Sequence, residues 1–150
     1  LGRDTKVKLA ISLNATENKT RSMLMPINRK YPLEKLLEAC RKFTQAPGRR
    51  ITFEYILIKG INDSEKDARR LAKLLRPIRS KINLIPLNPH EGCDFERSAE
   101  AVINKFQDIL IEKNYTVIIR KSKGQDISAA CGQLRARRLK SCTGNLIDEL

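Results

Sequence analysis

The stretch ITFEYILIKGINDSEKDARRLAKLLRPIRSKINLIPL, residues 51–87, decides the fold of this chain. Its first part, Ile51 to Ile58, is rich in β-branched and aromatic residues, and its last part, Lys81 to Leu87, is a second apolar run. Both compositions are typical of strands. Between them, apolar residues recur at helical spacing and stop before Pro77. A strand, a helix and a strand in this order predict a parallel βαβ unit.

Two local signals set the ends of this unit. Asp63 or Ser64 can accept hydrogen bonds from the first turn of the helix and is expected to cap it. Pro86 lacks a backbone N–H, so it is expected at the end of its strand, where no ladder donor is needed.

The same alternation continues toward the amino terminus. Lys8 to Leu13 is a compact apolar run and predicts a buried strand. A short helix is expected around Lys19 to Leu24. From Pro32 onward leucines recur at helical spacing, and this helix is expected to stop before Ala46.

Toward the carboxyl terminus, Ser98 is expected to cap a further helix, whose inward residues would be Ala101, Val102, Phe106, Ile109 and Leu110. Tyr115 to Arg120 then predicts a fourth strand, also buried. Four strands alternating with helices give an α/β class made of parallel βαβ units with right-handed crossovers. Because a barrel usually needs about eight strands, either the sheet is open or the chain is the latter part of a larger barrel.

Length and charge limit the class of protein. The 150 residues suit one domain, 1–150, with 30 Lys and Arg against 17 Asp and Glu and a net charge of +13. Such an excess favours binding to nucleic acid, although a merely soluble basic surface would give the same count. Four cysteines without a CxxC pair fit reduced thiols and a cytoplasmic location. No apolar run approaches the roughly 20 residues of a membrane span, so no membrane association is expected.

Polar residues follow the ends of the predicted strands. Ser12 and Asn14 end the first, Asn62 and Asp63 follow the second, and Asn88 ends the third. Since the carboxyl ends of parallel strands share one rim, these side chains are expected together, where they could bind a ribose or an amino-acid group of a cofactor. Taken singly, each could equally be a turn or capping residue.

Cys131 lies after the fourth strand among small residues, with basic residues on both sides. Neighbouring cations stabilise a thiolate and could also hold a polyphosphate, whereas a small buried cysteine would be the plain alternative. His90 and Cys93 form a single HxxC, which without a second ligand pair is interpreted as a loop, so no metal site is predicted within the chain. The glycine-rich nucleotide motifs GxGxxG and GxxxxGK[ST] are absent from the sequence.

Five segments in order resemble the RlmN/Cfr family of radical S-adenosylmethionine (SAM) RNA adenosine methyltransferases, and most closely its RlmN branch. They are LAISLNAT (9–16), MPINRKYPLEKLLEAC (25–40), RITFEYILIKGINDS (50–64), KINLIPLNPHEG (81–92) and VIIRKSKGQDISAACGQL (117–134). The resemblance implies a partial (β/α) radical SAM barrel with a 4Fe-4S cluster. It also implies that a cysteine, here Cys131, is methylated and then delivers carbon to C2 of an adenine in 23S rRNA, and in many members also in tRNA. The SAM contacts of the family fall on Ser12, Leu13, Asn14 and Asn88.

Several family elements are missing from the sequence. The cluster motif CxxxCxxC, the GEP-type SAM motif, the resolving cysteine and the amino-terminal RNA-binding domain are all absent, and in the family they precede the matched segments. The chain is therefore expected to be the carboxyl-terminal part of such an enzyme, inactive without the missing amino-terminal half. Gln125 replaces an acidic residue common in the family, and residues 135–150 lie outside the resemblance. The alternatives are a non-catalytic basic RNA-binding α/β module and an α/β domain that binds a nucleotide-like ligand without chemistry.

Overall fold

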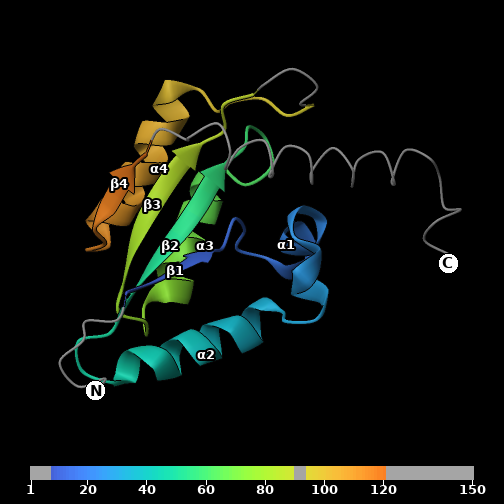
Figure 1. The fold of residues 1–150 in the computed structure, drawn as a ribbon. Coiled ribbons are helices and arrows are strands. Elements are labelled where there is room, and N and C mark those ends of the chain that lie inside the picture. Colours follow the sequence, from blue (N-terminus) through green and yellow to red (C-terminus); the bar gives the residue numbers. More distant parts are fainter. Residues whose placement is uncertain (1–7, 90–93, 121–150) are drawn as a thin grey trace, which may run out of the picture.

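A computed structural model of the chain describes residues 8–89 and 94–120. Four strands form one sheet in which every neighbouring pair is parallel (Figure 1). They are β1 (Lys8–Ser12), β2 (Arg50–Leu57), β3 (Ser80–Pro86) and β4 (Val117–Ile119), and they lie side by side in sequence order. This arrangement confirms the predicted α/β class of parallel βαβ units.

Helices connect the strands. They are α1 (Asn18–Leu24), the 3-10 helix η1 (Pro26–Arg29), α2 (Leu33–Gln45), α3 (Glu65–Leu75) and α4 (Glu100–Glu112). Apolar residues of α2, α3 and α4 form one buried cluster with alternate residues of the strands. The opposite face of the sheet, here called the open face, contributes no strand residue to this cluster; it presents Ser12, Thr52, Glu54, Asn83 and Ile118.

The central strand β2 shows why this stretch folds as it does. Ile51, Phe53, Tyr55 and Leu57 are fully buried, whereas the residues between them are half-buried on the open face. This period of two is the pattern of a strand with one face on the core. The Tyr55 ring lies 5.3 Å, centroid to centroid, from the ring of Phe106, which ties α4 to the centre of the sheet.

The outer strands are less buried than predicted. In β1 Leu9 is 38% exposed, and in β4 Ile118 and Ile119 are 45% and 37% exposed, while Val117 is buried. The prediction of buried strands at these two positions was therefore wrong. Each outer strand has only one described neighbour, so Leu9 and Ile119 stay partly exposed beside the free edges even though they lie on the face of the sheet that carries the core.

Predictions for the ends of helices and strands were confirmed at Ser64 and Pro86 and wrong at Ser98. Ser64 caps α3 in a capping box, and Pro86 is the last residue of β3, as expected. Ser98, in contrast, precedes the N-cap of α4, and its hydroxyl donates to Asp63 Oδ2 at 2.8 Å. Of the five predicted inward residues of this helix, Phe106, Ile109 and Leu110 are buried as expected, whereas Ala101 and Val102 are exposed. The buried residues are Ile103, Phe106, Ile109 and Leu110.

Among the helices of residues 8–89 and 94–120, none is long and apolar enough to cross a membrane.

Candidate functional site

The carboxyl ends of the four parallel strands meet at one rim of the sheet. Ser12 is the last residue of β1, and Asn14, Asn62 and Asn88 follow the ends of β1, β2 and β3. The backbone N–H of Leu87 donates to Leu57 O at 3.0 Å, which keeps the exits of β2 and β3 together. The structure thus brings together the polar residues predicted for this rim, while Cys131, His90 and Cys93 lie outside the described residues.

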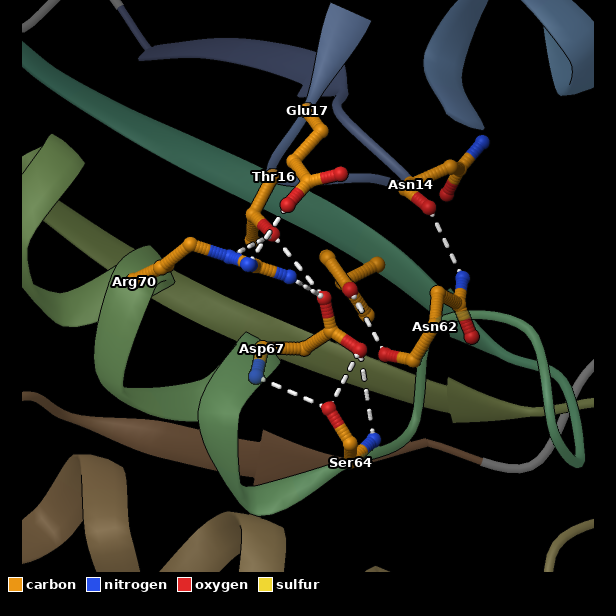
Figure 2. A network of polar contacts seen from close by, with 8 residues as sticks. Asn14, Thr16, Glu17, Asn62, Ser64, Asp67 and Arg70 are labelled. Atoms are coloured by element: carbon orange, nitrogen blue, oxygen red, sulfur yellow. Dashed lines mark hydrogen bonds and ion pairs between the residues drawn. The ribbon is translucent and has the colours of Figure 1, made fainter. Parts of the chain in front are cut away.

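Asn62 holds two of these strand ends in register (Figure 2). Its side-chain amide Nδ2 donates to the backbone oxygens of Asn14 and Ile56, both at 2.7 Å, and its Oδ1 accepts from the backbone N–H of Ile58 at 2.8 Å. Its own backbone oxygen accepts from the Tyr55 hydroxyl at 2.7 Å. Since Asn62 is only 1% exposed, its amide acts as a buried brace beneath the rim.

Arg21 of α1 braces the exit of β1 in a similar way. Its guanidinium donates to the backbone oxygens of Leu13 (3.0 Å) and Ser12 (3.1 Å) and to Asn28 Oδ1 (3.0 Å). The side chain is 4% exposed, and burial lowers the pKa of Arg21 from its ordinary value. The carbonyl groups of Ser12 and Leu13 are therefore engaged, which fixes the direction in which their side chains leave the strand.

The four residues predicted to contact a cofactor differ in burial and in whether their polar groups are already hydrogen-bonded. The Ser12 hydroxyl and the exposed Asn88 amide have no hydrogen-bond partner within residues 8–89 and 94–120, so both can meet a ligand. Leu13 is fully buried, and its N–H donates to Glu54 O. Asn14 has a positive φ of 61°, and its Oδ1 accepts from the backbone N–H of Ile56 at 2.9 Å. In this structure Leu13 and Asn14 thus shape the rim, while Ser12 and Asn88 present free polar groups.

The open face adds a polar row next to the rim. Ser12, Glu54, Asn83 and Ile118 lie on adjacent strands at the same level. Arg120, just after β4, reaches across β3, and its guanidinium lies 3.4 Å from Glu54 Oε1. Asn83 is 7% exposed, and its Oδ1 has no hydrogen-bond partner within the described residues. A buried amide oxygen without a partner carries a free-energy penalty, so a bound molecule with a donor would relieve it.

An apolar cluster lies beside these polar groups. Leu24, Ile58 and Leu87 are buried there, with Ile56 and Phe95 packed against them. A rim that joins apolar side chains to a few free polar groups is the usual composition of a small-molecule site.

A second polar network supports the rim from the start of α3 (Figure 2). Asp67 accepts hydrogen bonds from the hydroxyl groups of Ser64 (2.7 Å) and Thr16 (3.0 Å) and from Arg70 Nη2 (2.7 Å). Burial alone would raise the pKa of Asp67, but the hydrogen bonds from Ser64, Arg70 and Thr16 together lower it below its ordinary 3.8. Arg70 also pairs with Glu17, so this ionised cluster joins the segment after β1 to α3.

The one free cysteine within the described residues is unsuited to nucleophilic chemistry. Cys40 lies in the main core at 3% exposure, and burial raises the pKa of its thiol to about 11. A thiol of this kind is protonated near neutral pH and inert. Within the same residues no group of three His, Cys, Asp or Glu side chains could hold a metal ion.

Sequence reasoning missed three members of this site. Asn83 did carry a signal, because it interrupts the apolar run KINLIPL. Arg21 carried none, since its partners lie in other elements and only the fold brings them together. Arg70 carried a partial signal in its spacing of three from Asp67 on the same helix, but its contact with Thr16 depends on the fold. Glu54, whose role the sequence left open, is paired with Arg120.

No protein-family model matches the chain. Curated relatives do: "Dual-specificity RNA methyltransferase RlmN" of Desulfosudis oleivorans is 63% identical over 136 residues, which cover 91% of this chain and 37% of the relative. The protein of the same name from Geobacter sulfurreducens is 55% identical over 137 residues, covering 91% of this chain and 38% of the relative. The chain thus spans little more than a third of the length of these relatives.

Solved structures agree with this match. A radical SAM methyltransferase from Sphaerobacter thermophilus superposes with a TM-score of 0.77 at 50% identity, covering 89% of this chain and 39% of that one. A domain of a pyruvate-formate lyase-activating enzyme from Bacteroides vulgatus superposes with a TM-score of 0.63 at 22% identity, covering 75% and 66%, and shows a shared fold. Sequence and fold together place this chain in the RlmN branch of the radical SAM methyltransferases.

Proposed function

We propose that the complete protein containing this chain methylates carbon 2 of adenosine in 23S rRNA and in tRNA, and that the chain forms the carboxyl-terminal part of its radical SAM domain. The observation that carries the proposal is the match to RNA methyltransferases at 63% identity over 91% of the chain. The amino-terminal half, a cytoplasmic location and both RNA partners belong to the same proposal.

The described residues fit a bound SAM molecule. The Ser12 hydroxyl and the Asn88 amide are free at the rim, and Asn83 Oδ1 offers a buried acceptor without a donor on the open face. In this assignment Ser12 and Asn88 bind SAM directly, while Leu13 and Asn14 shape its pocket through their own backbone and amide contacts. SAM, together with a 4Fe-4S cluster whose ligands lie outside this chain, would supply the methyl group and the radical that starts the reaction.

Cys131 is proposed as the methyl carrier. Its thiol would lose its proton, and the sulfur would bond to the methyl carbon of SAM as the bond from that carbon to the sulfonium sulfur breaks and S-adenosylhomocysteine leaves. The carbon would pass to the adenine afterwards, in the radical step. The basic residues around it in the sequence would favour the thiolate. The inert state of Cys40 leaves that role to a cysteine elsewhere in the chain.

The test uses the complete protein, isolated as expressed. Mass spectrometry should find one added methyl group on the peptide containing Cys131, and Cys131→Ala should abolish both that group and RNA methylation. Cys142→Ala, which removes a cysteine only 11 positions away, serves as the control and should keep both. RNA methylation by the Cys131→Ala protein would refute the assignment.

Two further measurements separate the parts of the proposal. Asn88→Ala should raise the KM for SAM without changing the stability of the fold, because its amide has no partner in the described part of the chain. The isolated 150-residue chain should contain no iron and show no methylation; a brown, iron-containing preparation would contradict this.

A non-catalytic RNA-binding module is the second candidate, and the net charge of +13 is the observation in its favour. It predicts salt-dependent RNA binding, with no biological function lost on Cys131→Ala.

A further inference from the structure

The amino-terminal edge of the sheet, opposite the rim, carries an unusual concentration of positive charge. Residues 46–50, 76–81 and 113–116 lie at this edge; they comprise the three connections from a helix back to a strand, 46–49, 76–79 and 113–116, and the first residues of β2 and β3. They contain six Lys or Arg residues and no Asp or Glu. We name these six residues the basic edge: Arg49, Arg50, Arg76, Arg79, Lys81 and Lys113.

The rim at the other end has a different charge balance. Its connections within the described residues, 13–17, 58–64, 87–89 and 94–99, contain four acidic residues and two basic ones. Figure 1 shows the two sets of connections at opposite ends of the sheet. At about 3.3 Å per residue, the eight residues of β2 separate them by roughly 25 Å. The basic edge is therefore distinct from the proposed SAM site.

The positive charges of the basic edge are not neutralised within the described chain. None of the six residues forms an ion pair with another described residue, and Arg50, Arg76, Arg79 and Lys113 are exposed. Arg49 lies over the ring of Phe43, 4.9 Å from its centroid, which leaves its charge uncompensated.

Helix dipoles explain part of this charge but not all of it. The carboxyl ends of α2, α3 and α4 point toward this edge, and each is equivalent to about half a negative charge, or roughly 1.5 in total. Glu112 adds one more negative charge. It lines a depression of about 550 Å³ together with Arg76, Lys113, Arg69 and Lys73. Six cations exceed this negative charge by more than twofold, so capping of helix ends does not account for them.

The composition of the edge favours phosphate over protein as the partner. Four of the six cations are Arg, whose guanidinium can bind phosphate oxygens in a bidentate manner. The exposed large hydrophobic side chains of the described residues all lie outside these three connections, whereas a protein interface needs an apolar centre.

We propose that the basic edge binds the phosphate backbone of the RNA, as a second contact surface roughly 25 Å from the rim. The choice of RNA among polyanions rests on the proposed function; the existence of a polyanion surface does not. Such contacts would add affinity independent of base sequence and would serve RNAs long enough to reach both ends of the sheet.

The experiment compares two triple variants of the complete protein that have equal net charge. Arg50→Gln, Arg76→Gln and Arg79→Gln remove exposed cations of the basic edge. The control replaces Lys35, Lys66 and Lys105, which are exposed on the outer surfaces of the helices, with Gln. Circular dichroism checks that both proteins keep their fold.

RNA binding is measured across a series of salt concentrations. Each lost phosphate contact lowers the slope of log K against log salt by about 0.7 to 0.9, so the edge variant should lose about 2 units and the control well under 1. Equal slopes for the two variants would overturn the proposal. It would also be overturned if RNA binding were unchanged while the edge variant lost binding to polyglutamate, which would assign the edge to an acidic protein.

The test of the basic edge can fail or succeed independently of the test of the proposed function. Cys131→Ala should leave the salt slope unchanged, and the edge variant at saturating RNA should retain methyl transfer. A wild-type protein that fails to methylate RNA but shows the difference in slope would refute the proposed function and keep the basic edge.

Discussion

Replacing Asn62 with Ala tests whether the rim depends on one buried amide. The change removes three side-chain hydrogen bonds of 2.7–2.8 Å and leaves the backbone oxygens of Asn14 and Ile56 and the N–H of Ile58 without those partners. A buried backbone group that loses its partner costs about 1–3 kcal/mol. Because part of the rim can admit water, we expect a total loss of about 3–5 kcal/mol in the free energy of unfolding. Small domains have only about 5–15 kcal/mol in all.

The assay is urea unfolding of the 150-residue chain followed by circular dichroism. With a denaturant slope of about 2 kcal/mol per molar, the midpoint should fall by roughly 2 M. Asn88→Ala is the matched control on the same rim, and its change should stay within about 0.5 kcal/mol because its amide has no described partner.

A milder variant covers the case in which Asn62→Ala does not fold. Tyr55→Phe removes only the 2.7 Å bond from its hydroxyl to Asn62 O, at an expected cost of about 1 kcal/mol. A loss below about 1 kcal/mol for Asn62→Ala would refute the reasoning, since the three hydrogen bonds would then contribute nothing net.

Three other predictions concern charge, thiol chemistry and the open face. Asp67 has a folded-state pKa below its ordinary 3.8, so its ionisation stabilises the fold fully at pH values above 3.8 and less as the pH falls through the lowered pKa. The difference in free energy of unfolding between wild type and Asp67→Asn, measured at several pH values, should therefore narrow in acid. A difference that widens in acid would contradict this prediction. Cys40, with a thiol pKa of about 11, should resist iodoacetamide at pH 8 in the folded chain and react in urea. Peptide mass spectrometry detects the modification. Rapid modification of the folded chain would show that the Cys40 thiol is accessible. Asn83→Leu should leave the free energy of unfolding unchanged or raise it by up to about 1 kcal/mol, because it removes a buried amide oxygen without a described partner. In the complete protein, calorimetry should show that the same variant binds SAM more weakly. A stability loss of about 2 kcal/mol or more would show that the amide is hydrogen-bonded in the folded chain.

Local patterns in the sequence predicted most of the fold. The alternation in Ile51 to Ile58 indicated the face of β2 that is buried, and Ser64 and Pro86 ended their elements as their chemistry requires. These signals depend on a few neighbouring residues, which is why the sequence alone contains them. The prediction that the outer strands are buried was wrong because the burial of Leu9 and Ile118 depends on which elements lie beside them, and an apolar run contains no information on that.

The candidate site was predictable in position but not in detail. Parallel strands force their carboxyl ends to one rim, so the order of strands and helices along the chain is enough to group Ser12, Asn14 and Asn88. The sequence could not show which of these side chains are hydrogen-bonded within the protein and which are free, because that depends on partners far away in the sequence. Asn14 is engaged by Ile56, 42 positions away, whereas Ser12 and Asn88 are free within the described residues.

The two outer strands have a practical consequence for work with the isolated chain. The free edge of β1 is five residues long and that of β4 only three, and neither is paired with another described strand. An unpaired strand edge is a template for a second molecule, so concentrated solutions should contain dimers joined through β1. Light scattering should show a mass that rises with concentration, and Ala10→Lys should suppress the rise.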